Sequence, residues 1–133
     1  MSPPTNPTDP IATSSDTDRV RAVALDYIEG WYAGDAERME RSLHDDLVKR
    51  TPRRGDEPAK ADLRTVSKGR MVELTSRGGG SDVADPAIEV VVDDVSDDIA
   101  CARTVCVEFV DYMQLVKTPD GWKIANVLFR NAG

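Results

Sequence analysis

Apolar residues recur with helical spacing in the segment 16–33. They fall at i, i+3, i+4, i+7, i+8 and i+11 and form one stripe: Val20, Val23, Ala24, Tyr27, Ile28 and Trp31. This spacing predicts a long amphipathic helix with one buried face. Residues 15–17 offer side-chain oxygens for an N-cap, and Gly34 follows the last periodic residue, where a glycine commonly ends a helix.

Two shorter helical patterns follow. Asp35 can cap the first, which runs to Leu43 and is interrupted by the polar run that starts at His44. Ser67 can cap the second, whose apolar side ends before the Gly78–Gly80 run. Successive glycines weaken a helix, because each loses much conformational freedom on folding, so we expect a connector there.

The remaining segments have the composition of strands. Residues 47–51 and 63–66 read as short strands, and we expect the first to end at Pro52. Apolar and polar residues alternate over 88–93, which predicts another strand. The apolar run 99–116 is long for one strand, so we expect a bulge or a bend within it.

The chain closes with two strands around the turn Thr118–Gly121, where proline, aspartate and glycine favour a tight reversal. Alternation predicts that the first strand presents Phe109, Asp111, Met113 and Leu115 on one face. It predicts that the second presents Trp122, Ile124, Asn126 and Leu128 on one face. Asp111 interrupts an apolar face, so its carboxylate needs a partner, a proton or a solvated cavity.

The order of the predicted elements is helix, helix, strand, helix and then successive antiparallel strands, which indicates an α+β fold. A long bent antiparallel sheet around one long N-terminal helix would form a cone with a cavity inside. Residues 1–15 are rich in proline and polar residues, and we expect a disordered tail there. Residues 16–131 then form a single domain, and a domain of this size needs neither disulfide nor metal for stability.

The net charge of −7 argues against a protein that mainly grips nucleic acid or an anionic membrane. No apolar run approaches the ~18 residues of a spanning helix, and the first ten residues lack the features of a secretory signal. Cys101 and Cys106 would lie ~16 Å apart in a regular strand, too far for a disulfide. We therefore expect a cytoplasmic protein without nucleic-acid or membrane partners.

The segments 24–46, 67–75 and 110–129 resemble the nuclear transport factor 2-like superfamily, and most of all its putative lumazine-binding branch. The resemblance covers roughly residues 18–130. It implies a cone-shaped α+β fold related to cystatin, a homodimer formed through the sheet, and an internal pocket. The name of the branch records a proposed ligand, so the resemblance implies a pocket more firmly than a substrate.

Ketosteroid isomerases belong to the same superfamily, and the motifs around their site residues can be compared with this sequence. Their two oxyanion donors, a tyrosine of the first helix and a protonated strand aspartic acid, match Tyr27 and Asp111 in their local motifs. Their general base lies shortly after an acidic pair on the first strand, a position that falls on Thr51. Threonine is no proton acceptor, which argues against isomerase activity unless a gap brings Asp56 or Glu57 to that position.

The candidate ligand-binding residues are those expected on the inner faces of the helices and the sheet: Tyr27, Trp31, Met71, Phe109, Asp111, Met113 and Asn126. Val105 and Val107 would complete the wall. Tyr27 and Trp31 have a plainer interpretation as ordinary core, and Met71 is of a type that more often packs than binds. For Asp111 the alternatives are an exposed position beyond a bulge or an ion pair with Arg103.

His44 is the only histidine and a candidate acid or base, although a structural role at a helix end is the commoner explanation. The basic cluster Lys49, Arg50, Arg53 and Arg54 reads as a solvated rim, with an anion site at the pocket mouth as the alternative. No cysteine or histidine stands at metal-ligand spacing, so we expect neither metal nor cofactor.

These patterns lead to one main functional expectation and two alternatives. The main expectation is a homodimeric protein that binds a small, flat, mainly apolar or aromatic ligand without catalysis. The first alternative is a cyclase-, dehydratase- or isomerase-like enzyme that uses Asp111 and Tyr27. The second is a dimeric interaction module with a filled core.

Overall fold

The computed structural model describes residues 15–53 and 62–132. Its elements in chain order are α2 (Asp16–Ala33), α3 (Ala36–Ser42), β1 (Leu43–Arg53), β2 (Asp62–Val66), α4 (Lys68–Ser76), β3 (Glu89–Ser96), β4 (Ile99–Val105), β5 (Phe109–Thr118) and β6 (Gly121–Asn131). The predicted disordered tail, apart from Ser15, lies outside the described residues, as do Arg54, Asp56 and Glu57. No helix among the described residues is long and apolar enough to span a membrane.

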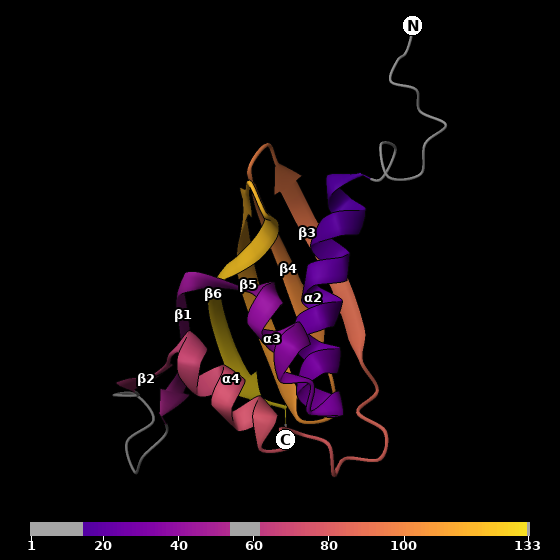
Figure 1. The fold of residues 1–133 in the computed structure, drawn as a ribbon, viewed down its shortest axis with the longest axis vertical. Coiled ribbons are helices and arrows are strands. Elements are labelled where there is room, and N and C mark those ends of the chain that lie inside the picture. Colours follow the sequence, from indigo (N-terminus) through magenta and orange to yellow (C-terminus); the bar gives the residue numbers. More distant parts are fainter. Residues whose placement is uncertain (1–14, 54–61, 133) are drawn as a thin grey trace, which may run out of the picture.

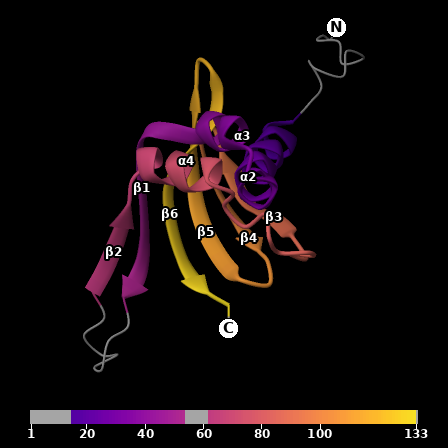
Figure 2. The same cartoon turned by 60° about the horizontal axis from the view of Figure 1, so that its bottom comes forward.

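The strands of the described chain form one curved sheet in the order β2-β1-β6-β5-β4-β3. Neighbouring strands are antiparallel except β1 and β6, which run parallel. The helices cover one face of this sheet, and β2 and β3 form its two edges (Figures 1 and 2). The predicted α+β fold is confirmed, as an open sheet with one parallel pair rather than a wholly antiparallel one.

Helix α2 has the predicted bounds and lies across β3, β4 and β6. Ser15 caps it, because its Oγ accepts a hydrogen bond of 3.0 Å from the backbone N–H of Asp18. Gly34 ends it in the left-handed conformation at φ 66°, which glycine adopts without steric cost. The stripe predicted from the sequence therefore faces the sheet, with Tyr27 and Ile28 fully buried.

Helix α4 begins at the predicted cap, where Ser67 Oγ accepts a hydrogen bond from the N–H of Arg70. The turn that follows packs tightly against the end of α2. A β-carbon at Gly80 would lie 2.6 Å from a ring carbon of Tyr32, so glycine permits this close approach. Helix α4 itself contacts α3 and β1.

The run 99–116 is a hairpin rather than one bent strand. β4 and β5 pair antiparallel, with Val105 opposite Val110, and residues 106–108 make the reversal. The N–H of Cys106 donates to the carbonyl of Phe109 over 3.0 Å and closes the turn. The prediction was wrong because Cys-Val-Glu contains no glycine, proline or asparagine to indicate a turn.

Strand β6 contains a bulge that the strict alternation did not predict. Gln114 pairs with Asn126 and Leu115 pairs with Ile124, so Ala125 has no partner in β5. One extra residue reverses the facing of everything beyond it. Ile124 therefore points to the core, whereas Asn126 lies on the exposed outer face, contrary to the prediction that they share a face.

The acidic stretch after α3 does not end a helix, because Leu43 already starts β1. His44 accordingly lies in a strand. The sequence had suggested a position at a helix terminus instead. β1 also continues through Pro52, which pairs with Leu63 of β2. The proline is tolerated because the last pair between β1 and β6 is Arg50 with Leu128, so β1 has one neighbour at that point.

Candidate functional site

A cavity of about 230 Å³ lies between α2, α4 and the inner face of the sheet. Its lining is mainly aromatic and aliphatic: Tyr27, Ile28, Trp31, Lys49, Arg64, Val66, Met71, Leu74, Phe109, Asp111, Phe129 and Asn131. Two cations and one carboxylate are therefore set in a mainly apolar wall, together with the polar groups of Tyr27 and Asn131. Such a combination of apolar walls with a few convergent polar groups is typical of small-molecule sites.

Tyr27 of α2 and Asp111 of β5 meet in this cavity. The Tyr27 hydroxyl donates to Asp111 Oδ1 over 3.1 Å, and the Thr104 hydroxyl of β4 donates to Oδ2 over 3.0 Å. Asp111 is only 2% exposed. The carboxylate interrupting the apolar face of β5 is thus held by two buried hydroxyl donors, not by Arg103, which lies 3.7 Å from Asp93.

Lys49 of β1 completes the polar group. Its Nζ donates to Tyr27 Oη over 2.7 Å and lies 3.4 Å from the sulfur of Met71. The same nitrogen stands 4.6 Å from the ring centre of Phe129 and 5.1 Å from that of Tyr27. An ammonium over two aromatic rings gains a cation–π attraction. Lys49, Tyr27, Asp111 and Thr104 therefore form one continuous hydrogen-bonded chain.

Burial shifts the protonation equilibria of this chain. It lowers the pKa of Lys49 from 10.5 to about 8, an effect that the charge of Asp111 opposes and that of Arg64 reinforces. Burial raises the pKa of Asp111, against the influence of Lys49 and the two hydroxyl donors. Burial, together with the neighbouring Asp111, raises the pKa of Tyr27 well above 10. Each charged form is disfavoured because burial removes these groups from bulk water.

Arg64 brings a second cation to the cavity from β2. Thr51 pairs with Arg64 and Lys49 pairs with Val66, so these side chains share the inner face of the β1–β2 pair. Arg64 makes no ion pair or side-chain hydrogen bond within the described part of the chain. A guanidinium presents a planar fork of N–H donors, which suits a carboxylate, a phosphate or a carbonyl oxygen.

Aromatic side chains form the walls around this chain. The rings of Phe109 and Phe129 meet edge to face, with centroids 5.9 Å apart and planes at 83°. Trp31 lines the cavity from α2, and its buried indole N–H has no hydrogen-bond partner among residues 15–53 and 62–132. The walls suit a flat ring, which offers large apolar faces and a thin edge.

The structure brings five of the seven predicted ligand-binding residues to the cavity: Tyr27, Trp31, Met71, Phe109 and Asp111. The other two lie elsewhere. Met113 points inward but is packed in the core, and Asn126 lies on the outer face, where its amide donates to Gln114 over 3.0 Å. Val107 was expected in the wall, but it sits in the β4–β5 turn and is 53% exposed.

His44 is remote from the cavity in the fold. It lies five residues before Lys49 along β1, a distance of ~16 Å in an extended strand. Its Nδ1 accepts a hydrogen bond of 2.9 Å from the backbone N–H of Asp46. His44 is thus not among the residues that line the cavity, and it lies near the start of strand β1.

The sequence interpretation missed Lys49 as an interior residue. Lys49 is only 7% exposed, although the basic cluster had been assigned to a solvated rim. The signal was the alternation along β1: Leu47 and Lys49 point inward, whereas Arg50 points outward. Treating neighbouring cations as one cluster concealed that they lie on opposite faces of the strand.

The geometry of the cavity also bears on isomerase activity. Thr51, the position of the expected base, is half-buried and carries no carboxylate, while Asp56 and Glu57 lie outside the described residues. Tyr27 directs its proton to Asp111 and accepts one from Lys49. The donor that this chain presents to the cavity is therefore the Lys49 amine rather than a pair of acidic hydroxyls.

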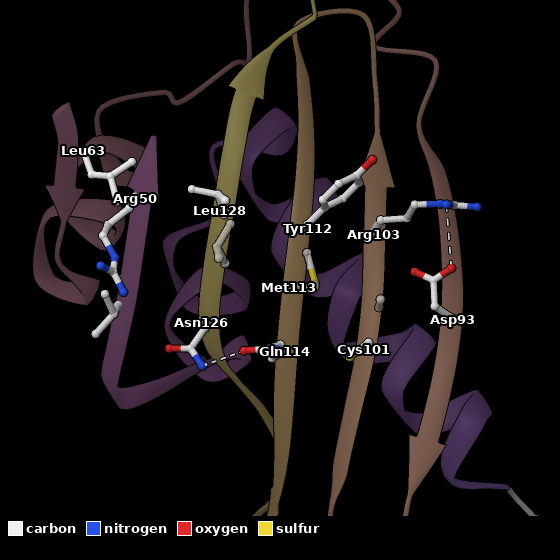
Figure 3. Close-up of a pocket in the computed structure, with 13 residues that line it drawn as sticks. Arg50, Leu63, Asp93, Cys101, Arg103, Tyr112, Met113, Gln114, Asn126 and Leu128 are labelled. Atoms are coloured by element: carbon white, nitrogen blue, oxygen red, sulfur yellow. Dashed lines mark hydrogen bonds and ion pairs between the residues drawn. The ribbon is translucent and has the colours of Figure 1, made fainter. Parts of the chain in front are cut away.

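A larger hollow of about 830 Å³ lies on the opposite, outer face of the sheet. Arg50, Tyr112, Asn126 and Leu128 are among its lining residues, and all project from the side of the sheet away from the helices (Figure 3). This hollow is an open groove without a buried titratable group, so we take the smaller internal cavity as the candidate site. Within the described residues, no three acidic, histidine or cysteine side chains cluster as a metal site would require.

Comparisons with known proteins agree with this fold. A family model described as putative lumazine-binding matches residues 15–130. A search among curated proteins finds no match to this chain. Similarity to solved structures, by contrast, is extensive.

Three of these structures illustrate the similarity. An NTF2-like protein with a cystatin-like fold from Novosphingobium aromaticivorans has a TM-score of 0.67 and 16% identity, covering 99% of this chain and 92% of that one. An NTF2-like protein of unknown function from Silicibacter pomeroyi has a TM-score of 0.66 and 16% identity, covering 85% and 92%. A ketosteroid isomerase-like protein from Erwinia carotovora atroseptica has a TM-score of 0.63 and 18% identity, covering 90% and 98%. At these identities the similarity establishes the fold.

Proposed function

The chain belongs to the putative lumazine-binding family of the nuclear transport factor 2-like superfamily, and from this premise we propose that its internal cavity binds a small, flat ligand. The ligand is mainly apolar or aromatic and carries an oxygen acceptor or an anionic group. Its ring lies among Trp31, Phe109 and Phe129, and its oxygen faces Lys49 and Arg64. Binding needs no catalysis and no further cofactor.

The Lys49 ammonium group is the observation that carries this proposal. It has three N–H donors, of which Tyr27 Oη and the weak acceptor Met71 Sδ take two. No carboxylate of the described chain forms an ion pair with it. A buried cation with a spare donor is costly to fold, and a ligand oxygen that accepts the third hydrogen bond offsets that cost.

The size and the shape of the cavity narrow the class of ligand. About 230 Å³ is below the ~300–1,000 Å³ of sites for drug-sized molecules, which favours one ring or two fused rings. The family name points to lumazine, a flat two-ring pteridine with two carbonyl oxygens. Such a molecule has flat aromatic faces that can pack against the walls. Its carbonyl oxygens can accept hydrogen bonds from Lys49 and Arg64.

A thermal-shift screen tests this function. Pteridines, flavins, steroids, aromatic polyketides and simple aromatic carboxylates form the panel, with lumazine included. A ligand at 100 times its dissociation constant adds about 2.7 kcal/mol to the free energy of unfolding. In Lys49→Met the affinity falls by about 10- to 100-fold, because a hydrogen bond to a charged donor is lost.

Lys68→Met is the matched control for that screen, because Lys68 lies on α4 outside the cavity and pairs with Glu40 and Asp45. It should keep the wild-type affinity. A ligand that binds Lys49→Met as tightly as the wild type would remove the amine from the site. A panel without any stabilising compound would favour the interaction module instead.

The outer face of the sheet forms the second part of the proposal, a homodimer. Large apolar side chains are exposed along its groove: Leu63 at 49%, Tyr112 at 59% and Leu128 at 50% (Figure 3). Burying such a face against a second copy removes apolar area from water, and the resemblance noted above implies the same surface. The groove also carries both Arg103 and Asp93, so two copies can present opposite charges to each other.

Light scattering should therefore give about twice the chain mass of 14.6 kDa. Tyr112→Glu places a charge at the centre of the face and should shift the protein toward the monomer. Val107→Glu is the matched control, because Val107 is equally exposed but lies in the β4–β5 turn outside the groove. A wild-type protein that remains monomeric at high concentration would contradict the dimer.

A further inference from the structure

Groups from five elements surround the amine of Lys49, and together they create an unusual setting for a lysine. Tyr27 of α2, Met71 of α4 and Phe129 of β6 lie close to the nitrogen, as the distances above state. The charged groups that face it are Asp111 of β5, beyond Tyr27, and Arg64 of β2. The nitrogen is therefore held next to an apolar space, with a phenol at hydrogen-bond distance and a carboxylate behind that phenol.

We propose that Lys49 is an amine nucleophile that forms a Schiff base with an aldehyde or ketone group of a small aromatic ligand. The proposal deepens the function proposed above and rests on it, because the same cavity holds the ligand. It assigns the third N–H position of Lys49 to a carbonyl group rather than to a permanent anion. The class of ligand is thus an aromatic carbonyl compound.

The chemistry balances without an oxidant or a reductant. The ammonium first loses a proton, and the free lone pair attacks the carbonyl carbon to form a C–N bond. The C=O electrons move to oxygen, which takes up a proton to give a carbinolamine. The C–O bond then breaks, water leaves with its second hydrogen from nitrogen, and a C=N bond remains. Amine and carbonyl become imine and water.

The Tyr27–Asp111 pair supplies the proton path that these steps need. Tyr27 Oη is 2.7 Å from Nζ, and its own proton lies on the hydrogen bond to Asp111. A proton leaving Nζ can pass to Tyr27 as the tyrosine proton passes to the carboxylate. The carbinolamine oxygen is two bonds from Nζ, so Tyr27 is placed to return the proton to it.

The lowered pKa of Lys49 also favours nucleophilic attack by its amine. With its pKa lowered to about 8, roughly one-tenth of Lys49 is neutral at pH 7, against fewer than about one in a thousand for an ordinary lysine. The raised pKa of Asp111 also makes its carboxylate a better proton acceptor than an exposed one. The apolar walls limit the water that would hydrolyse the imine.

Reductive trapping with benzaldehyde tests the proposal on the wild-type protein. Benzaldehyde and sodium cyanoborohydride are added at pH 7, so that hydride converts any imine to a stable secondary amine. Intact mass gives the stoichiometry, and peptide mapping locates the benzyl group. We expect Lys49 to be labelled at least about 10-fold faster than Lys68, Lys117 and Lys123, since its neutral fraction is far larger. Tyr27→Phe should slow the labelling about 10-fold or more by removing the relay.

The outcomes separate this proposal from the binding function. Labelling spread over the surface lysines, with Lys49 unmodified or no faster, overturns the Schiff base. Benzoate, which cannot form an imine, is tested in parallel by thermal shift. If benzoate stabilises the wild type but Lys49 is not trapped, binding stands and the nucleophile falls. If benzoate fails to stabilise and no lysine is selectively trapped, the Schiff base falls, and the binding function falls with it only when no other compound of the panel stabilises the protein.

Discussion

Replacing Asp111 with alanine should lower the free energy of unfolding by about 3–5 kcal/mol at pH 7. The carboxylate accepts hydrogen bonds from the Tyr27 and Thr104 hydroxyls, and all three groups are buried. Alanine leaves both hydroxyls without their acceptor and removes the charge that balances Lys49 in the cavity. Because a domain is stable by only about 5–15 kcal/mol, a loss of this size is a large part of the total.

Chemical denaturation of a matched pair of variants separates these contributions. Asp111→Asn keeps the size and one carbonyl acceptor, so its cost should be about 1–2 kcal/mol. Thr104→Val removes one hydroxyl donor while keeping the carboxylate and the shape, and should cost a similar amount. If Asp111→Ala is as stable as the wild type to within about 1 kcal/mol, the hydrogen-bonded chain does not support the fold as the structure indicates.

The stability of the wild-type protein should rise relative to Lys49→Met by about 2–3 kcal/mol between pH 7 and pH 10. Burial lowers the pKa of Lys49 from 10.5 to about 8 in the folded state. Between these values the unfolded chain keeps a proton that the folded protein has released. Stability increases with pH wherever the unfolded state binds more protons, so the cost of burying the ammonium is full below pH 8 and is relieved above it.

Denaturation profiles of the two proteins across this range provide the measurement, and their difference cancels the titration of the other groups. Lys68→Met is again the control. Burial acts to lower the pKa of Lys68, but its bonds to Asp45 and Glu40 outweigh burial and raise it. The contribution of Lys68 to the free energy of unfolding is thus present below pH 10.5 and lost only above that pH. The Lys68→Met profile should therefore parallel the wild-type profile up to pH 10. If the difference in the free energy of unfolding between the wild type and Lys49→Met did not change with pH, Lys49 would be solvated.

The helices could be predicted from the sequence because their signals are local. The apolar stripe of α2 indicates the helix itself, and the cap at Ser15 and the glycine at Gly34 indicate its two ends. The structure has those bounds. Tyr27 and Asp111 could be placed together through the family resemblance. The sequence pattern itself singled out each residue separately, Tyr27 on the apolar face of a long helix and Asp111 as the polar residue on an apolar strand face.

The sheet was harder, because its errors arise where the sequence carries no marker. The reversal at residues 106–108 lacks turn residues, and the bulge at Ala125 lacks a glycine. Lys49 was missed because the inward position of a cation depends on partners far away in the chain, namely Tyr27 and Asp111. Alternation along β1 indicates the face, but only the tertiary contacts show that the face encloses a cavity.

The most direct test of the internal cavity as the binding site is an NMR titration of nitrogen-15-labelled protein with each compound of the panel. Binding should change the backbone amide shifts around Tyr27, Lys49, Met71 and Phe129, which come from four different elements and meet only in the cavity. The outer-face residues should keep their shifts. Changes confined to the groove around Tyr112 and Leu128, or no change with any compound, would contradict a ligand site inside the fold.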